Sequence, residues 1–155
     1  MTLSDAEQAA LRAKFRRHWQ ETVPFNLYSG VVIERWDPDG VRFRLPLRHE
    51  LTGHKEIFHG GVIAALVDMC ASGAVVAGHD FNLGSRLTTV SMSVQFLAGA
   101  PGEDALAEGV CVRRGRTVSF AEARIVGANS GKPLATGQIA ASVTGGHAVV
   151  RQEVR

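Results

Sequence analysis

The sequence is poor in the residues that several kinds of functional site need. It has two cysteines, Cys70 and Cys111, and both fall inside apolar periodic segments, so we expect buried thiols of a reducing compartment rather than a disulfide framework. Among its six histidines, His49, His54 and His59 recur every five residues without metal-ligand spacing, so no metal site is expected. It also lacks a Gly-x-Ser-x-Gly elbow, a Walker loop and a dinucleotide fingerprint, which argues against serine hydrolases and nucleotide-binding enzymes.

The sequence also has little net charge. The formal net charge is +2 over 155 residues, and the lysines and arginines form no long block, so bulk nucleic-acid binding is not expected. The polar, acidic residues 1–7 do not resemble a signal peptide. The apolar run 62–77 is short for a membrane span and is interrupted by Asp68. We therefore expect a cytoplasmic protein with neither a nucleic-acid nor a membrane partner.

The composition and the start of the chain indicate one domain with a helical beginning. Hydrophobic residues make up 45% of the sequence, enough for a single domain with a real core over residues 1–155. Ser4 and Glu7 match a helix capping box, which predicts an amphipathic helix over residues 4–21. This helix would form an N-terminal helical extension, residues 1–24.

The middle of the chain is expected to hold a hairpin, a loop and a long apolar helix. The strand-like runs 27–36 and 41–47 are joined by the strong turn sequence Asp-Pro-Asp-Gly. The polar residues 48–58 are interpreted as a loop. The apolar helix that follows is expected to stop at Gly78.

In the last part of the chain the apolar residues recur with a period of two, which predicts four strands separated by short breaks. The four runs are 87–97, 104–113, 117–127 and 134–143. Consecutive strands with short turns imply an antiparallel meander, and residues 145–155 are expected to be a loose tail. A hairpin, one long helix and four strands suggest an α+β fold with a curved antiparallel sheet wrapped around the helix.

The most informative stretch is the start of the apolar helix. Gly60 and Gly61 open it, and Asp68 follows among apolar side chains. Helix starts expose unpaired N–H groups with the positive end of the dipole behind them, and glycine lets a ligand approach the backbone closely. An oxyanion donor and a carboxylate on one helix point to acyl chemistry.

Residues 27–143 resemble the hotdog-fold acyl-CoA thioesterases, in the subgroup typified by the phenylacetate-pathway and 4-hydroxybenzoyl-CoA enzymes. The strongest element is His59-Gly60-Gly61, followed by an apolar helix with Asp68 in the acidic position of the family. The supporting segments are residues 88–96, 112–117, 121–124 and 131–137. The resemblance implies the hotdog fold, with the sheet wrapped around a long central α-helix.

The resemblance also implies hydrolysis of an acyl-CoA to a free acid and coenzyme A, with no cofactor beyond the coenzyme A of the substrate. The Gly60 N–H would polarise the thioester carbonyl, and Asp68 would act as nucleophile or general base with help from Thr89. A structural Asp68 at a subunit contact is the alternative. A functional His59 would contact the substrate or shuttle a proton. A structural His59 would instead hydrogen-bond the loop backbone and shape the turn.

The expected substrate-binding residues are Gly61, Val62, His54, Arg113, Arg114, Gly115 and Arg116. Clustered guanidinium groups suit the phosphates of coenzyme A, and the resemblance places their turn near the nucleotide; a solvated hairpin turn is the alternative. Gly53 departs from the family, which commonly has Asn or Gln in this loop. His54 beside it is the candidate substitute.

Hotdog proteins generally dimerise by joining their sheets edge to edge, and the family's site lies between subunits. We therefore expect a homo-oligomer, either a dimer or a homotetramer built as a dimer of dimers, with Gly60 and Asp68 of one site on different chains. Two alternatives remain: a non-catalytic acyl-CoA-binding protein, suggested by the missing Asn or Gln, and an acyl-thioester hydratase or dehydratase. The sequence does not specify the acyl group.

Overall fold

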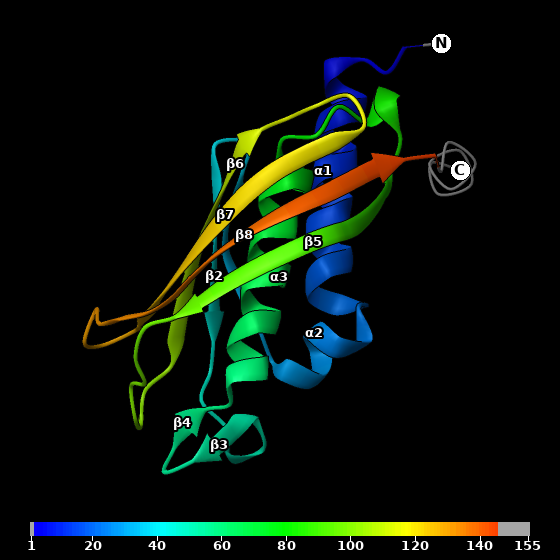
Figure 1. Ribbon diagram of the computed structural model, residues 1–155. Helices are drawn as coiled ribbons and strands as arrows, with labels where there is room; N and C mark the ends of the chain where they lie inside the picture. The colour runs from blue at the N-terminus through cyan, green and yellow to red at the C-terminus, as the bar shows by residue number, and fades with distance from the viewer. Residues whose placement is uncertain (1, 146–155) are drawn as a thin grey trace.

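The computed structural model describes residues 2–145 as a six-stranded antiparallel sheet curled around one long helix (Figure 1). In chain order the elements are α1 (Asp5–Glu21), α2 (Pro24–Ser29), β1 (Val32–Asp37), β2 (Gly40–Leu45), η1 (His49–Leu51), β3 (Thr52–His54), β4 (Ile57–Phe58), α3 (Gly60–Ala77), η2 (Phe81–Leu83), β5 (Arg86–Phe96), β6 (Ala105–Arg113), β7 (Val118–Gly127) and β8 (Pro133–Thr144). This confirms the expected α+β architecture. All of the predicted tail beyond residue 145 lies outside the described residues.

The first helix begins and ends where the sequence predicts. Ser4 Oγ accepts a hydrogen bond from the Glu7 N–H at 3.3 Å, and Glu7 Oε2 accepts one from the Ser4 N–H at 2.8 Å, which confirms the capping box. The buried Gln8 then fixes α1 to the loop after α3. Its Nε2 donates to Asp80 Oδ1 at 2.6 Å and its Oε1 accepts from the Phe81 N–H at 3.0 Å, so α1 runs beside α3 (Figure 1).

Two local predictions are wrong. The run 27–36 is not one strand, because α2 occupies its first residues and β1 begins only at Val32. Pro24 sits in the first turn of α2, where its fixed φ suits a helix, and Gly30 closes the helix in the left-handed region at φ 73°. Residues 48–58 are not a plain loop either, since η1 and the small antiparallel pair β3–β4 form there.

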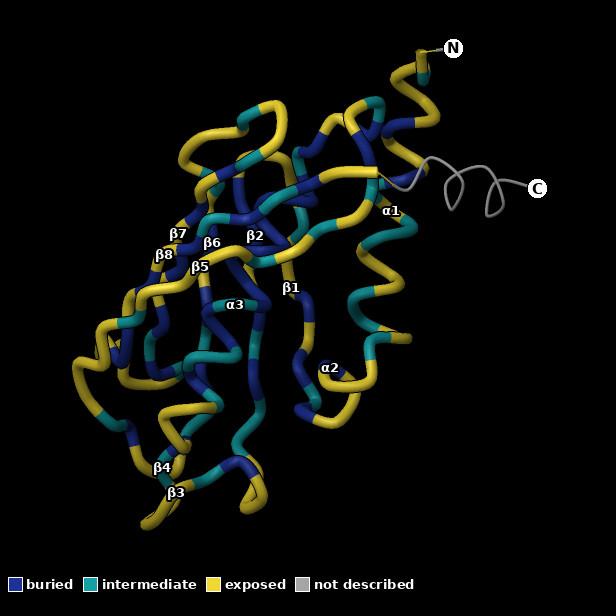
Figure 2. The backbone as a smooth tube through the Cα atoms, turned by 45° about the vertical axis from the view of Figure 1, so that its right-hand side comes forward, coloured by how far each residue is buried: buried dark blue, intermediate teal, exposed yellow. Residues whose placement is uncertain are grey.

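The sheet order β1-β2-β6-β7-β8-β5 departs from a simple meander. β6, β7 and β8 are consecutive neighbours as expected, but β5 pairs with β8 and not with β6. Period-two alternation specifies which side chains face the core, and it does not specify which strand is the neighbour. As a result β5 is an edge strand, exposed or half-buried along its whole length (Figure 2).

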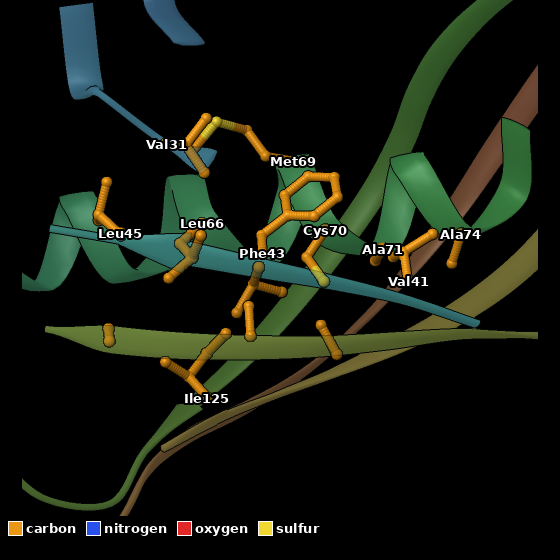
Figure 3. Packing of buried hydrophobic residues seen from close by; sticks show 14 of the residues in the cluster. Val31, Val41, Phe43, Leu45, Leu66, Met69, Cys70, Ala71, Ala74 and Ile125 are labelled. Carbon is orange, nitrogen blue, oxygen red and sulfur yellow. The ribbon is translucent and has the colours of Figure 1, made fainter. Parts of the chain in front are cut away.

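The core lies between α3 and the inner face of the sheet. Figure 3 shows Phe43, Leu66, Cys70 and Ile125 packed there, each with no exposed surface. Burial raises the pKa of the Cys70 thiol, so it packs as an inert apolar group. By length and composition α3 could also span a membrane, but 67% of it is buried in the protein, as expected of a core helix.

Candidate active site

The start of α3 leaves one backbone donor open. His59 is the N-cap residue, and its Nδ1 accepts a hydrogen bond from the Gly61 N–H at 2.9 Å. The N–H groups of Val62 and Ile63 donate to the His59 carbonyl. Within residues 2–145 the N–H of the exposed Gly60 has no acceptor. An unpaired donor at the positive end of an 18-residue helix suits a carbonyl oxygen that gains negative charge.

His59 therefore has a structural task in this structure. Because its Nδ1 accepts the Gly61 N–H, the neutral ring carries its proton on Nε2. We expect His59→Ala to lower the free energy of unfolding by about 1 kcal/mol, the usual cost of losing a side-chain cap, and His59→Asn to restore most of it. Denaturant unfolding measures both. If His59→Asn is stable and still loses turnover, the ring has a catalytic role beyond capping.

Asp68 lies half-buried on α3 and is held by two hydroxyl groups. Thr89 Oγ1, on β5, donates to Asp68 Oδ1 at 2.8 Å. Ser72 Oγ, one turn further along α3, donates to the same oxygen at 3.4 Å and lies 3.3 Å from Thr89 Oγ1. The structure thus brings the predicted pair Asp68 and Thr89 together. It adds Ser72, a buried residue missed by sequence reasoning although its i,i+4 spacing from Asp68 could have shown it.

The open donor of Gly60 and the carboxylate of Asp68, both on α3, lie beside opposite ends of β5. Asp68 is anchored to Thr89 near the start of the strand. Gly60 is next to Phe96 at the end of it, since two Phe96 ring atoms lie 3.7 and 3.9 Å from the position of a Cβ on Gly60. Along α3, residues 60 and 68 are also about 12 Å apart. One chain therefore cannot place both groups on a single carbonyl.

The arginine turn lies toward the other end of α3. Arg114 Nη2 donates to the carbonyls of Pro38 at 2.8 Å and Ala74 at 3.0 Å, so its guanidinium ties the β1–β2 turn to the last turns of the helix. This position supports a structural role for Arg114. Arg113 and Arg116 are exposed at the β6–β7 turn. The chain is tight between them, because a Cβ on Gly115 would clash with the Val118 carbonyl oxygen.

The loop before α3 places the predicted Gly53 slot beside the helix start. A Cβ on Gly53 would lie 3.6 Å from His59 Cα, so the position is next to the open donor although it has no side chain to offer. His54 is exposed at the end of β3, and Val62 is half-buried in the first turn of α3. These placements are compatible with substrate contact.

A comparison with protein families matches residues 56–133, about half of the chain, to the Thioesterase superfamily. The match spans Gly60, Asp68, Ser72 and Thr89, and so contains both halves of the site. The chain belongs to the thioesterase superfamily. Its curved sheet around α3 is the hotdog fold of these thioesterases.

Individual relatives agree with this assignment. A candidate esterase of Halobacterium salinarum is 31% identical over 102 residues, which cover 64% of this chain and 67% of the relative. A thioesterase family protein from Silicibacter pomeroyi superposes with a TM-score of 0.80 at 23% identity, covering 87% and 99% of the two chains. A hypothetical thioesterase from Streptococcus pneumoniae, solved with coenzyme A, has a TM-score of 0.65 at 20% identity, covering 75% and 87%. The last two likenesses are likenesses of fold.

Proposed function

We propose that this thioesterase-superfamily protein hydrolyses an acyl-CoA to a free acid and coenzyme A, as the phenylacetate-pathway and 4-hydroxybenzoyl-CoA subgroup does. The observation that carries the proposal is the open Gly60 N–H at the head of α3, together with a carboxylate held by two hydroxyls on the same helix. The coenzyme A in the Streptococcus pneumoniae relative supports this choice of thioester. Arg113 and Arg116 are the exposed cations available to its phosphates.

In this mechanism the thioester oxygen accepts a hydrogen bond from the Gly60 N–H, which stabilises the negative charge that develops during attack. Asp68 either removes a proton from the attacking water or attacks the carbonyl carbon itself. If water attacks, a new C–O bond forms, the C–S bond breaks, and the free acid is released while coenzyme A leaves as a thiolate that takes up a proton. If Asp68 attacks, the same departure of coenzyme A leaves an Asp68–acyl anhydride, which a water molecule then hydrolyses to the free acid and the original carboxylate. Thr89 and Ser72 orient Oδ1 of Asp68, and Oδ2, which has no hydrogen-bond partner among the described residues, is the oxygen left to act on the substrate.

We propose further that the active form is a homodimer joined along β5, alone or paired into a homotetramer. β5 is an 11-residue edge with exposed apolar side chains. The opposite edge, β1, is blunted by a bulge and by the ion pairs of Arg35 with Asp37 and Asp39. Two antiparallel copies of β5 would bring the start of one strand to the end of the other. Asp68 of one chain would then meet Gly60 of its partner.

This dimer predicts a clear difference between the two edges of the sheet. Met92 on β5 and Val32 on β1 are each 43% exposed. Met92→Lys would place two lysines close together near the two-fold axis. We expect it to yield monomers and to lower kcat/KM by roughly 10²-fold or more, because the two half-sites separate. Sedimentation equilibrium gives the mass, and Val32→Lys should stay dimeric and active. A dimeric, active Met92→Lys protein would contradict β5 pairing.

The activity itself is tested by free-thiol release from short, medium, long and aryl acyl-CoAs. Turnover of at least one of these thioesters is the expected result. Binding of acyl-CoA without turnover would support a non-catalytic acyl-CoA-binding protein. If the protein neither binds nor hydrolyses any of these thioesters, the assignment to coenzyme A thioesters is overturned.

A further inference from the structure

Phe96 is the large side chain that borders the open donor of α3. Apart from chain neighbours and the backbone of α3 itself, its ring supplies the atoms within 4 Å of the Cβ position of Gly60. The ring is nevertheless 58% exposed. A bulky apolar ring kept in the open beside a polar helix end has a free face for a ligand to contact.

The sheet register places Phe96 on the site side. On β5, Phe96 pairs with Ala135 of β8, and Met92 pairs with Ile139. Ala135 and Ile139 are buried against the core, and paired residues of neighbouring strands face the same side of a sheet. Ser93 and Gln95, at the alternate positions of β5, are exposed and belong to the outer face. The Phe96 ring therefore stands on the same side of the sheet as α3.

Distances then decide which part of a thioester would meet the ring. A Cβ lies about 2.5 Å from its own backbone nitrogen, so the nearest ring atom is at most about 6 Å from the Gly60 nitrogen. A carbonyl oxygen on that N–H would lie about 2.9 Å from the nitrogen. The atoms joined to the carbonyl carbon are the sulfur and the first acyl carbon. Both atoms are then within reach of the ring, which can offer them only van der Waals contact.

We infer that Phe96 determines acyl specificity by limiting bulk at the carbon next to the thioester carbonyl. This inference rests on the proposed function. Acyl groups that are unbranched at that carbon, or flat as in an aryl acyl group, pack against the ring. Acyl groups branched at that carbon collide with it. Phe96 is a specificity residue and takes no part in proton transfer.

The test compares Phe96→Ala with Phe120→Ala. Phe120 is 43% exposed and lies on the outer face of β7, so it controls for the loss of an exposed aromatic ring from the sheet. The readout is the ratio of kcat/KM for propionyl-CoA to that for isobutyryl-CoA. We expect Phe96→Ala to lower this ratio by roughly tenfold or more, the usual effect of one methyl group in a tight site, and Phe120→Ala to leave it unchanged. An unchanged ratio in Phe96→Ala, or equal changes in both variants, would overturn the inference.

A binding experiment separates this inference from the proposed activity. Ketone analogues of the two acyl-CoAs, with a methylene in place of the sulfur, cannot be hydrolysed at that position. Calorimetry gives the ratio of their Kd values for each variant. If neither the wild type nor either variant hydrolyses thioesters, but the Kd ratio changes only in Phe96→Ala, the hydrolase proposal fails and the role of Phe96 stands. If the analogues do not bind and no thioester is turned over, both fail.

Discussion

Replacing Asp68 with asparagine should lower kcat/KM for thioester hydrolysis by a factor of roughly 10²–10⁴, the usual contribution of a general base. Asparagine has the shape of aspartate, and its amide oxygen can still accept the hydroxyl hydrogen bonds of Thr89 and Ser72. It cannot take up a proton from water or attack a carbonyl. The loss therefore reports on chemistry while the fold is kept. Free-thiol release measures it, and the unfolding midpoint verifies the fold.

Glu108→Gln is the matched control for that substitution. Glu108 is an exposed carboxylate on β6, where it pairs with Arg42 on the outer side of the sheet. Its neutralisation should leave turnover close to that of the wild type. Full activity in Asp68→Asn would remove Asp68 from the chemistry and leave the structural reading of this residue.

Replacing Gly60 with proline should remove the open donor and little else. Proline has no N–H, and it is favoured at the first position of a helix, which Gly60 occupies in α3. The preceding His59 has ψ 138°, an extended conformation that the residue before a proline prefers. Losing one oxyanion donor typically costs a factor of about 10²–10³ in kcat. We expect that loss in steady-state kinetics with an unchanged unfolding midpoint.

Gly60→Ala separates the N–H from the glycine itself. A Cβ at this position meets Phe96 at 3.7 Å, an ordinary contact, and the backbone N–H is retained. This variant should therefore keep most of the activity that Gly60→Pro loses. Equal losses in the two variants would show that space, and not the donor, matters at residue 60.

The two inactive variants also test whether the site is shared between chains. In a mixed dimer of Asp68→Asn and Gly60→Pro chains, one site combines an intact Gly60 with an intact Asp68 from the other chain. Random mixing of subunits should then restore about a quarter of wild-type activity. If verified mixed dimers show no restored activity, each site is built by one chain. That outcome would contradict the inference drawn from the distance between Gly60 and Asp68 along α3.

Local sequence patterns determined most of the elements of this protein. The capping box at Ser4, the glycine start of α3 and the period-two runs of the last four strands each depend on neighbouring residues only, so they could be found without a structure. The prediction of one strand over residues 27–36 was wrong, because Pro24 and Gly30 together stabilise a short helix where strand-like residues predominate. The placement of Asp68 on the apolar helix and the open donor at Gly60 were likewise visible in the local pattern, while the catalytic role of Asp68 came from the resemblance to the thioesterase family.

Tertiary structure decided what lies next to what. Only the sheet order shows that β5 is an edge, and only the packing shows that Thr89 and Ser72 hold Asp68 while Arg114 holds the far part of α3. The placement of Phe96 beside Gly60 joins the two ends of a 37-residue stretch (60 to 96) and has no local signal. Contacts between distant segments depend on how the whole chain buries its apolar surface, and no window of neighbouring residues contains that information.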